Sequence, residues 1–522
     1  MIFRSPYPDV SIPDVPLTPY VLQRAQALAD KPALIDGPTG RTLTYGQLAG
    51  GVRLAAAGLA QRGFQKGDVF AIYLPNLPEY AVAFHAVASL GGINTTVNPL
   101  YTADELAYQL NDAGARFLLT IPQFLNQALE AAGKSKIEEV FVLGEAEGAT
   151  PFASLLQNDG QMPAVQIDPG EDLVVLPYSS GTTGLPKGVM LTHRNLVANV
   201  CQVEGAGEYV TQDDVVIGVL PFFHIYGMLV ILNATLYQGA TIVTMPRFDL
   251  EQFLQIMQDY GVTRAYLVPP IILALAKHPI VDQYDLSKLK MITSGAAPLG
   301  EDVARACAER LGCLVLQGYG LTETSPVTHV SPEMPDRIKL AAVGPCVPNT
   351  ECKIVDVATG AELGPNEEGE IWIRGPQVMK GYLNNPEATA ETIDAEGWLR
   401  TGDVGYADED GYFYIVDRVK ELIKYKGFQV APAELEALLL SHPAIADAAV
   451  IPSPDEEAGE VPKAFLVLRQ EITAEEIMAF VAEHVAPYKK IRRVEFVDQI
   501  PKSTAGKILR RVLIEREREK AT

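Results

Sequence analysis

The sequence predicts an α/β protein whose parallel sheets are covered by helices on both faces, followed by a small α+β module. Two observations carry this prediction. Helix and strand signals alternate through the first half of the chain, and the elements become shorter after about residue 415. The length agrees with several units, because 522 residues correspond to about three to four domains of about 150 residues each.

In the first half, capping residues mark where helices begin, and short apolar runs mark the strands between them. We expect, in order, a helix from the Thr44–Gln47 capping box to Gly63, a strand over Val69–Leu74, a helix over Tyr80–Leu90, a helix from the Thr102–Glu105 capping box, a strand over Phe117–Thr120 and a buried strand over Leu173–Pro177. Strands separated by helices in this way favour parallel pairing.

The C-terminal part shows a different pattern of short elements. We expect a strand over Tyr412–Val416, a helix over Pro432–Leu440, a strand over Ala464–Leu468 and a helix from the Thr473–Glu476 capping box. The change to shorter helices and strands predicts a domain boundary near Asp417–Lys420.

Composition excludes several classes of function. The 65 acidic and 42 basic residues give a net charge of −23, so we expect no nucleic-acid partner, and any anionic ligand needs local cations. The five cysteines are odd in number and lack CxxC spacing, which favours a reducing compartment. No run reaches the about 18 apolar residues of a membrane span, and the proline-broken start carries no signal core. We therefore expect a cytoplasmic enzyme.

The stretch Tyr178–Gly188 has the composition of a phosphate-binding loop. It combines three glycines, which allow close backbone approach, with four serine and threonine hydroxyls and the positive charge of Lys187. The pattern is not a Walker loop, which has a glycine before its lysine and Ser/Thr after it. A polar strand-to-helix turn without a ligand is the alternative. The proposed phosphate contacts are Ser179, Ser180, Gly181, Thr182, Thr183 and Lys187.

Four further segments follow in order: Gln317–Glu323, Gly397–Asp403, Asp417–Gly427 and Pro501–Lys507. Together with the phosphate loop they resemble the signatures of AMP-forming acyl-CoA synthetases, the adenylating superfamily of 4-coumarate–CoA ligases, fatty-acid ligases and beetle luciferases. The resemblance covers essentially the whole chain and is strongest toward 4-coumarate–CoA ligases. It implies a large N-terminal body of βαβ subdomains plus a distorted barrel over residues 1–417, and a small mobile α+β domain over 418–522.

The resemblance implies that ATP activates a carboxylic acid to acyl-AMP with release of pyrophosphate, and that coenzyme A then displaces AMP. Because two anions meet in the first step, the site has to neutralise charge more than supply a base. The implied roles are adenine contact for Tyr319, α-phosphate contact for Thr322, Mg²⁺ binding for Glu323, ribose binding for Asp403 and Arg418, and a carboxylate–phosphate bridge for Lys507. Gln317, Gly318 and Lys420 belong to the same nucleotide-binding set.

The resemblance places thioester formation on another part of the mobile domain. Lys424, Lys426, Gly427 and Gln429 match the stretch that faces the site in this step, and Arg247 matches a position that contacts CoA phosphate. A thiol of pKa about 8.5 is already partly ionised near neutrality, so no strong base is needed. Since Lys507 and Lys424 serve different steps, the domain has to turn about Asp417–Lys420 between them.

The acyl pocket is implied by two further segments. Phe222–Met228 resembles the segment whose histidine, here His224, gates the acyl tunnel and whose aromatic residue, here Tyr226, lines it. Ser294–Gly300 matches the pocket floor, with Gly295 and Ala296 beside the acyl chain. Leu229 and Val230 stand where plant coumarate ligases often have polar residues. Thr293 stands where those enzymes commonly have a lysine that meets the substrate's 4-hydroxyl. Apolar walls discriminate weakly between acids.

The acid therefore stays open between a hydroxycinnamate, another aryl acid and a medium- or long-chain fatty acid. A luciferase-like oxygenase and a carrier-protein adenylating enzyme share the adenylation residues and are further alternatives. A non-enzymatic nucleotide-binding protein is a different class, but we expect such a protein to lack one of the two lysines, Lys424 and Lys507. The sequence does not determine the oligomeric state.

Overall fold

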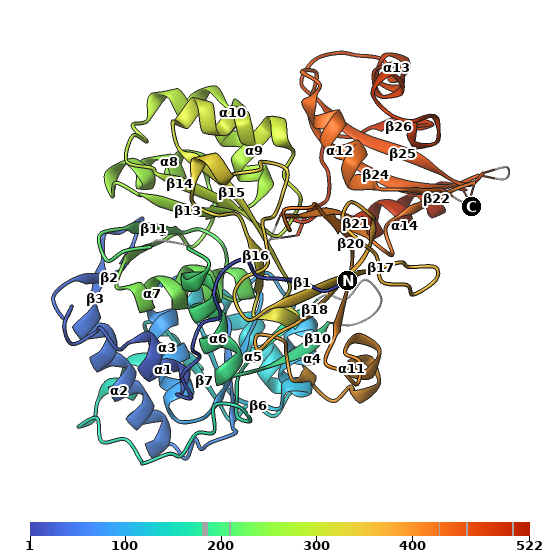
Figure 1. Cartoon of the computed structure of the whole chain (residues 1–522). Coiled ribbons are helices and arrows are strands. Elements are labelled where there is room, and N and C mark those ends of the chain that lie inside the picture. Colours follow the sequence, from blue (N-terminus) through green and yellow to red (C-terminus); the bar gives the residue numbers. More distant parts are fainter. Residues whose placement is uncertain (180–185, 208–209, 427, 456–457, 504–505, 522) are drawn as a thin grey trace.

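Four β-sheets carry the architecture of the computed structural model (Figure 1). The structure describes residues 1–179, 186–207, 210–426, 428–455, 458–503 and 506–521, without the side chains at 428–429 and 518–521. Two eight-stranded sheets form the large body, a five-stranded antiparallel sheet adjoins them, and another five-stranded sheet forms the C-terminal module.

The first large sheet has the strand order β19-β10-β9-β5-β4-β6-β7-β8. Its strands are β4 (Val69–Ile72), β5 (Ile93–Thr96), β6 (Ala115–Thr120), β7 (Glu139–Val142), β8 (Thr150–Pro151), β9 (Leu173–Ser179), β10 (Lys187–Thr192) and β19 (Gly381–Tyr382). The strands from β4 to β9 run parallel, whereas β10 is antiparallel to both β9 and β19. The expected phosphate loop thus connects two antiparallel strands and is not a strand-to-helix turn.

The second large sheet has the order β16-β15-β14-β13-β11-β12-β2-β3. Its strands are β2 (Pro32–Asp36), β3 (Thr42–Thr44), β11 (Val215–Gly218), β12 (Thr241–Thr244), β13 (Arg264–Leu267), β14 (Met291–Ser294), β15 (Leu314–Gly320) and β16 (Val327–Val330). The six inner strands are parallel, and the edge strands β3 and β16 are antiparallel.

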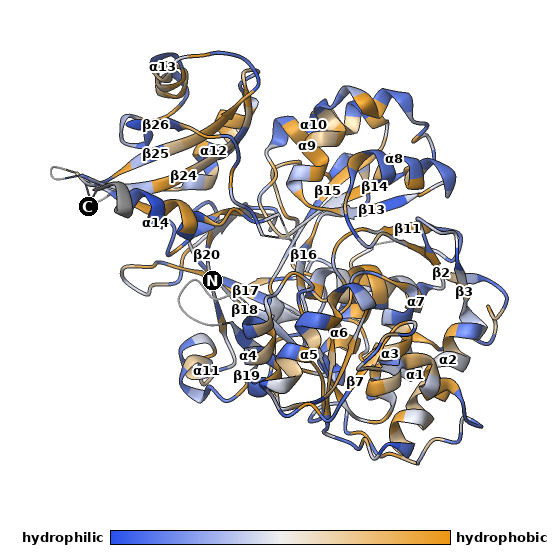
Figure 2. Cartoon of the chain, turned by 180° about the vertical axis from the view of Figure 1, so that it is seen from behind, coloured by the Kyte–Doolittle hydropathy of each residue, from blue (hydrophilic) through white to orange (hydrophobic). Residues whose placement is uncertain are grey.

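Helices fill the space between these sheets and cover their outer faces. They are α1 (Leu17–Val21), α2 (Tyr45–Gln61), α3 (Pro78–Ser89), α4 (Ala103–Ala113), α5 (Leu125–Gly133), α6 (His193–Gly205), α7 (Thr235–Gln238), α8 (Leu250–Asp259), α9 (Pro269–Lys277) and α10 (Glu301–Leu311). The apolar helix α3 is buried nearly all round, because it contacts β4 and β5 of one sheet and β2 of the other. In Figure 2, α8 and α10 carry both hydrophobic and hydrophilic stretches, as expected of helices that cover a sheet with one face.

The third sheet is entirely antiparallel, with the order β1-β17-β18-β20-β21. It contains β1 (Phe3–Arg4), β17 (Glu351–Val355), β18 (Gly369–Arg374), β20 (Leu399–Ala407) and β21 (Phe413–Arg418), and α11 (Pro386–Thr392) lies between β18 and β20 in the chain. The strand order is open, so the expected distorted barrel is a half-barrel.

The C-terminal module has its own sheet and core. It contains β22 (Ile423–Tyr425), β23 (Phe428–Val430), β24 (Ile445–Asp455), β25 (Gly459–Leu468), β26 (Arg493–Phe496), α12 (Pro432–Ser441), α13 (Ala474–His484) and α14 (Arg510–Ala521). Ile423, Leu439, Val450, Leu466 and Val481 are buried together between the sheet and its helices. None of the described helices is both long and apolar enough to cross a membrane.

The expected helices and strands are confirmed, with small shifts at their ends. The Thr44, Thr102 and Thr473 side chains each accept a hydrogen bond from the backbone three residues later, and a Glu or Gln side chain there closes each capping box. The strand expected at Ala464 begins earlier, at Gly459, because β25 pairs with all of β24.

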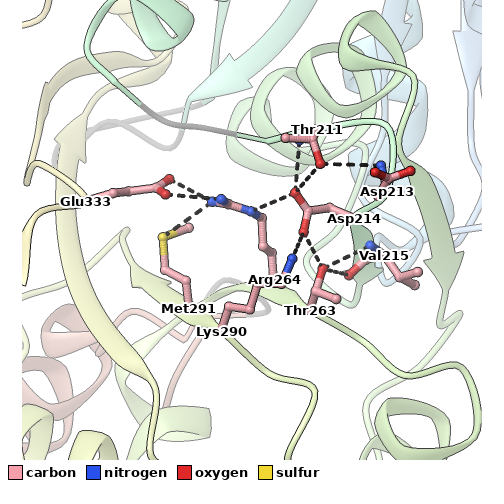
Figure 3. A network of polar contacts seen from close by, with 9 residues as sticks. All are labelled: Thr211, Asp213, Asp214, Val215, Thr263, Arg264, Lys290, Met291 and Glu333. Atoms are coloured by element: carbon pink, nitrogen blue, oxygen red, sulfur yellow. Dashed lines mark hydrogen bonds and ion pairs between the residues drawn. The ribbon is translucent and has the colours of Figure 1, made fainter.

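A buried ion-pair network ties the amino ends of the second sheet's strands together (Figure 3). The Arg264 guanidinium donates to both carboxylate oxygens of Glu333, at 2.6 and 3.0 Å, and to Asp214 at 3.2 Å. Only 7% of Arg264 and 1% of Asp214 is exposed. Burial opposes ionisation of Asp214, but hydrogen bonds from Thr211, Lys290 and Thr263 and the nearby charge of Arg264 lower its pKa to about 2.

We expect Arg264→Met to lower the free energy of unfolding by about 3–5 kcal/mol, because it leaves two buried carboxylates without their shared cation. Lys290→Met is the matched control. It also removes a cation from Asp214, but the lysine is 61% exposed, so the loss should stay below about 1 kcal/mol. Urea unfolding followed by circular dichroism measures both, and equal losses would contradict the prediction.

Candidate active site

The two large sheets meet at the carboxyl ends of β9 and β15, where ligands of parallel α/β sheets commonly bind. Glu323 lies in a 3₁₀ turn, Thr322–Thr324, directly after β15. Its Oε1 accepts hydrogen bonds from the Ser179 hydroxyl at 3.0 Å and from the Tyr382 hydroxyl at 2.9 Å. Within the described part of the chain, Oε2 of Glu323 has no hydrogen-bond partner. The carboxylate is therefore fixed on one side and available on the other.

The expected phosphate loop is only partly described. Ser180, Gly181, Thr182 and Thr183 lie outside the described residues. At its two ends, Ser179 and Lys187 are directly paired across β9 and β10. The Lys187 ammonium lies 5.0 Å from the centre of the ring of Tyr382, the residue whose hydroxyl donates to Glu323.

The expected nucleotide residues Tyr319, Asp403 and Arg418 are in contact. The Tyr319 hydroxyl donates to Oδ2 of Asp403 at 2.6 Å, and Nε of Arg418 lies 3.2 Å from Oδ1. Asp403 and Arg418 face each other across β20 and β21. Burial and the Asp403 carboxylate hold the pKa of Tyr319 well above its usual value. Asp403 is also the main cause that raises the pKa of Arg418.

Three other expected nucleotide residues have different surroundings. The buried amide of Gln317 donates to the carbonyls of Leu299 and Leu340, so its side chain holds backbone in place. Gly318 pairs with Val330 across β15 and β16. Lys420 is exposed in the turn after β21.

The expected acyl-pocket residues lie around the start of a π-helix, Tyr226–Ala234. Nδ1 of His224 accepts the Tyr226 backbone N–H at 3.3 Å, so the neutral ring carries its proton on Nε2. Burial lowers the pKa of His224 to about 3, and the positive charge of Lys507 contributes. Val230 lies in the π-helix and is only 3% exposed.

The pocket floor is packed against the Tyr226 ring. A Cβ on Gly295 would lie 2.8 Å from a ring carbon, so no side chain fits there. The Tyr226 hydroxyl donates to the Thr293 carbonyl at 3.1 Å, and Ala296 has a left-handed backbone with φ of 69°. The Thr293 hydroxyl itself is buried and has no hydrogen-bond partner among the residues that the structure describes.

Two hydrogen bonds link Lys507 to Ser503, and Lys507 lies near the charged residues of this site. The backbone N–H of Ser503 donates to the Lys507 carbonyl at 2.8 Å, and the Ser503 hydroxyl accepts the Lys507 N–H at 3.2 Å. The residue as a whole is exposed to solvent, while its ammonium group is partly desolvated by the surrounding protein. This desolvation lowers the pKa of Lys507, Arg418 lowers it further, and the Asp403 and Glu323 carboxylates oppose the change.

Of the residues expected to act in thioester formation, those whose side chains the structure describes are exposed. Lys424 is exposed on β22, where its backbone N–H donates to Glu460 at 2.8 Å, and Lys426 is exposed beside it. Gly427 and the Gln429 side chain lie outside the described residues. Arg247 is exposed between β12 and α8. In this structure it is Lys507 that lies at the site.

Two residues of the site were missed by the sequence analysis. Tyr382 contacts Glu323 from a two-residue strand that pairs with β10. Asn76, which is 4% exposed, donates to the carbonyls of Gly218 and Leu220 and accepts the Phe222 N–H, and so supports the segment that leads to His224. Neither has a local signal, because both act through partners far away in the sequence.

Comparison with known proteins places this geometry in a family. The model of the AMP-binding enzyme family matches residues 21–383, and that of the AMP-binding enzyme C-terminal domain matches residues 434–507. The chain is 49% identical to 4-coumarate–CoA ligase 5 of Oryza sativa subsp. japonica, over 98% of this chain and 96% of the relative. It is also 49% identical to 4-coumarate–CoA ligase of Pinus taeda, over 98% and 97%.

Solved structures agree with this assignment. The crystal structure of the anthranilate CoA ligase AuaEII in complex with anthranoyl-AMP has a TM-score of 0.90 at 28% identity, covering 98% of this chain and 99% of that one. The o-succinylbenzoate CoA synthetase of Bacillus subtilis, in complex with its acyl-adenylate intermediate, has a TM-score of 0.82 at 31% identity, covering 96% and 98%. The chain therefore belongs to the AMP-binding enzyme family and is an ATP- and CoA-using, AMP-forming acid–CoA ligase, similar over nearly its whole length to the plant 4-coumarate–CoA ligases.

Proposed function

We propose that the acid is a hydroxycinnamate or a closely related planar aryl acid, with 4-coumarate as the reference substrate. The observation that carries the proposal is the 49% identity over nearly the full chain to plant 4-coumarate–CoA ligases. The flat wall formed by the Tyr226 ring against the backbone of Gly295 also favours a planar acyl group. A fatty acid is the competing substrate, because Val230 and its apolar neighbours discriminate weakly.

We propose that Lys507 drives the first half-reaction by neutralising charge. The acid's carboxylate oxygen attacks the α-phosphorus of ATP, and both groups are anionic. An ammonium group between them lowers this repulsion and stabilises the negative charge of the transition state. Its position among Arg418, Asp403 and Glu323 supports this role. Neutral His224, with a proton on Nε2, would donate a hydrogen bond to the acyl group.

For ATP, we propose that Tyr319 contacts the adenine, that Asp403 accepts hydrogen bonds from the ribose hydroxyls and that Arg418 assists there. Thr322 and the loop hydroxyls from Ser179 to Thr183 would donate to the phosphates, with Lys187 adding charge. The contacts among Tyr319, Asp403 and Arg418 support this arrangement, because they fix the ring and the carboxylate before ATP binds.

We propose that Glu323 holds Mg²⁺. Its carboxylate suits the ion, because Oε1 is held by two hydroxyls, while no described residue hydrogen-bonds Oε2. Mg²⁺ in nucleotide sites commonly takes one or two carboxylates together with phosphate oxygens and waters. When bound, it would neutralise charge on the phosphates and the leaving pyrophosphate.

For the second half-reaction, we propose that residues 418–522 turn relative to residues 1–417 and bring Lys424, Lys426, Gly427 and Gln429 to the site, while Arg247 binds CoA phosphate. The joint at Asp417–Lys420 supports this. Asp417 accepts the backbone N–H of Ala433 at 2.8 Å, at the start of α12, and so couples the joint to the module. All five cysteines are buried thiols, which supports a reducing compartment such as the cytoplasm.

With Mg²⁺ present, we expect ATP to be cleaved to AMP and pyrophosphate in a reaction that depends on the acid. Removal of the metal with EDTA should abolish turnover, and added Mg²⁺ should restore it, because the phosphates then regain their counter-charge. Chromatography of the nucleotide products checks this. Formation of ADP and phosphate would show that the proposed chemistry is wrong.

We expect substitutions of Lys507 and Lys424 to slow different half-reactions. Lys507→Ala should slow acyl-adenylate formation by about 10²–10³ and leave thioester formation from supplied acyl-adenylate largely intact, and Lys424→Ala should do the reverse. Pyrophosphate exchange and single-turnover thioester formation measure the two steps. Lys490→Ala, a lysine of the same module outside both groups, is the control. Equal damage to both steps by both variants would count against the turning domain.

We expect kcat/KM for cinnamate to lie within about tenfold of that for 4-coumarate, which corresponds to about 1.4 kcal/mol. The Tyr226 hydroxyl already donates to the Thr293 carbonyl, so Tyr226→Phe should leave this ratio unchanged. A preference for 4-coumarate above about a hundredfold that disappears in Tyr226→Phe would show a dedicated phenol contact. A medium-chain fatty acid, measured alongside, tests the substrate class, and a higher kcat/KM for it would overturn the aryl-acid proposal.

A further inference from the structure

Three side chains that bind soft metal ions meet in the core between β16, β17 and the loop before β17. His329 lies on β16, Cys346 in the loop and Cys352 on β17, and each is at most 1% exposed. Nε2 of His329 lies 3.5 Å from Sγ of Cys346 and 3.5 Å from Sγ of Cys352, and the two sulfurs are 3.2 Å apart. This triad is the one group of three or more His, Cys, Asp or Glu ligand atoms that converge in this way among the described residues.

The backbone and a neighbouring hydroxyl hold the triad in place. His329 and Cys346 form an antiparallel bridge, and Cys352 pairs with Ile373 and Phe3 in the half-barrel. The Thr328 hydroxyl lies 3.0 Å from Nδ1 of His329, which directs Nε2 toward the sulfurs. A hydrogen bond to the second ring nitrogen is the usual support of a metal-binding histidine.

The distances between the three ligand atoms and the apolar residues around them favour Zn²⁺ over Cu⁺. Around tetrahedral Zn²⁺, with Zn–S about 2.3 Å and Zn–N about 2.0–2.1 Å, ligand atoms stand about 3.5–3.8 Å apart. The two sulfur–nitrogen distances already agree, and the sulfurs need to separate by about half an ångström. The triad lies among Ile354, Ile371 and Phe413, where a net charge is costly. Two thiolates balance Zn²⁺ to zero, whereas Cu⁺ would leave one negative charge.

We propose that His329, Cys346 and Cys352 bind one Zn²⁺ ion. Binding replaces the two thiol protons, which leave to solvent, by two Zn–S bonds, and the neutral imidazole adds a Zn–N bond. A site with three protein ligands keeps a fourth position, which a water molecule would fill. Because the triad is buried, the ion would enter during folding.

The site lies directly behind the proposed nucleotide residue. Tyr319 and His329 are cross-strand partners on β15 and β16, and their ring centres are 5.7 Å apart. Zn²⁺ would thus link β16, the strand paired with Tyr319, to β17 of the half-barrel. This consequence rests on the proposed role of Tyr319, but the metal site itself does not, and metal content can be measured without any substrate.

The test is the metal content of the full chain produced in Zn²⁺-supplemented medium and dialysed against EDTA. Elemental analysis should give about one Zn²⁺ per chain for the wild type and below about 0.1 for Cys346→Ser, Cys352→Ser and His329→Gln. Cys307→Ser removes another fully buried thiol, in α10, and is the matched control, which should retain the ion.

A second measurement does not depend on whether the variants fold. The wild type refolded with Co²⁺ should show the thiolate-to-cobalt absorption and the intense visible bands of a tetrahedral site, and a pH indicator should report about two protons released per chain. Wild-type chain with less than about 0.1 Zn²⁺ and no cobalt spectrum would overturn the proposal. A Cys346–Cys352 disulfide as the main species in mass spectrometry, or Zn²⁺ retained in all three variants, would overturn it as well.

Discussion

One buried carboxylate, that of Asp403, connects the parts of the molecule that have to act together. It belongs to β20 of the half-barrel, receives the hydroxyl of Tyr319 from the end of β15 and pairs with Arg418, one residue after the expected domain boundary. Because each oxygen has its own partner, the charge is satisfied although only 5% of the residue is exposed. Asp403 thereby fixes the position of the half-barrel relative to the second large sheet and to the segment that leads into the C-terminal module.

The chain carries a net charge of −23, yet its reaction brings a carboxylate and a triphosphate into one site. Cations of the site lie close to a carboxylate or an aromatic ring. Arg418 pairs with Asp403, and Lys187 lies over the ring of Tyr382. The remaining positive charge comes with Lys507, from the C-terminal module. In the proposed turning of the module, this charge would leave the site once the anions have reacted, which a cation fixed in the body does not allow.

Local signals in the sequence were sufficient for the helices and strands that were expected from it, and long-range pairing was not visible. The capping boxes at Thr44, Thr102 and Thr473 specify helix starts through neighbours three residues away, so their position follows from the sequence alone. The pairing of β10 with β19 involves Tyr382, almost two hundred residues later, and the apolar run over Tyr226–Ala234 gives no sign of a π-helix. The motif residues around Glu323 were found by resemblance, but the hydroxyls that hold its carboxylate required the structure.

Gly506, next to Lys507, has a left-handed backbone with φ of 75°, and a Cβ there would lie 3.2 Å from Val268 and 3.5 Å from Pro270 of the body. A side chain at this position would crowd the body, so glycine allows Lys507 to lie close to it. A methyl group at this point would have to displace Val268 by a few tenths of an ångström and would strain the left-handed backbone, while every charged residue remained in the chain. The placement of the proposed catalytic lysine thus depends on a neighbour that has no side chain.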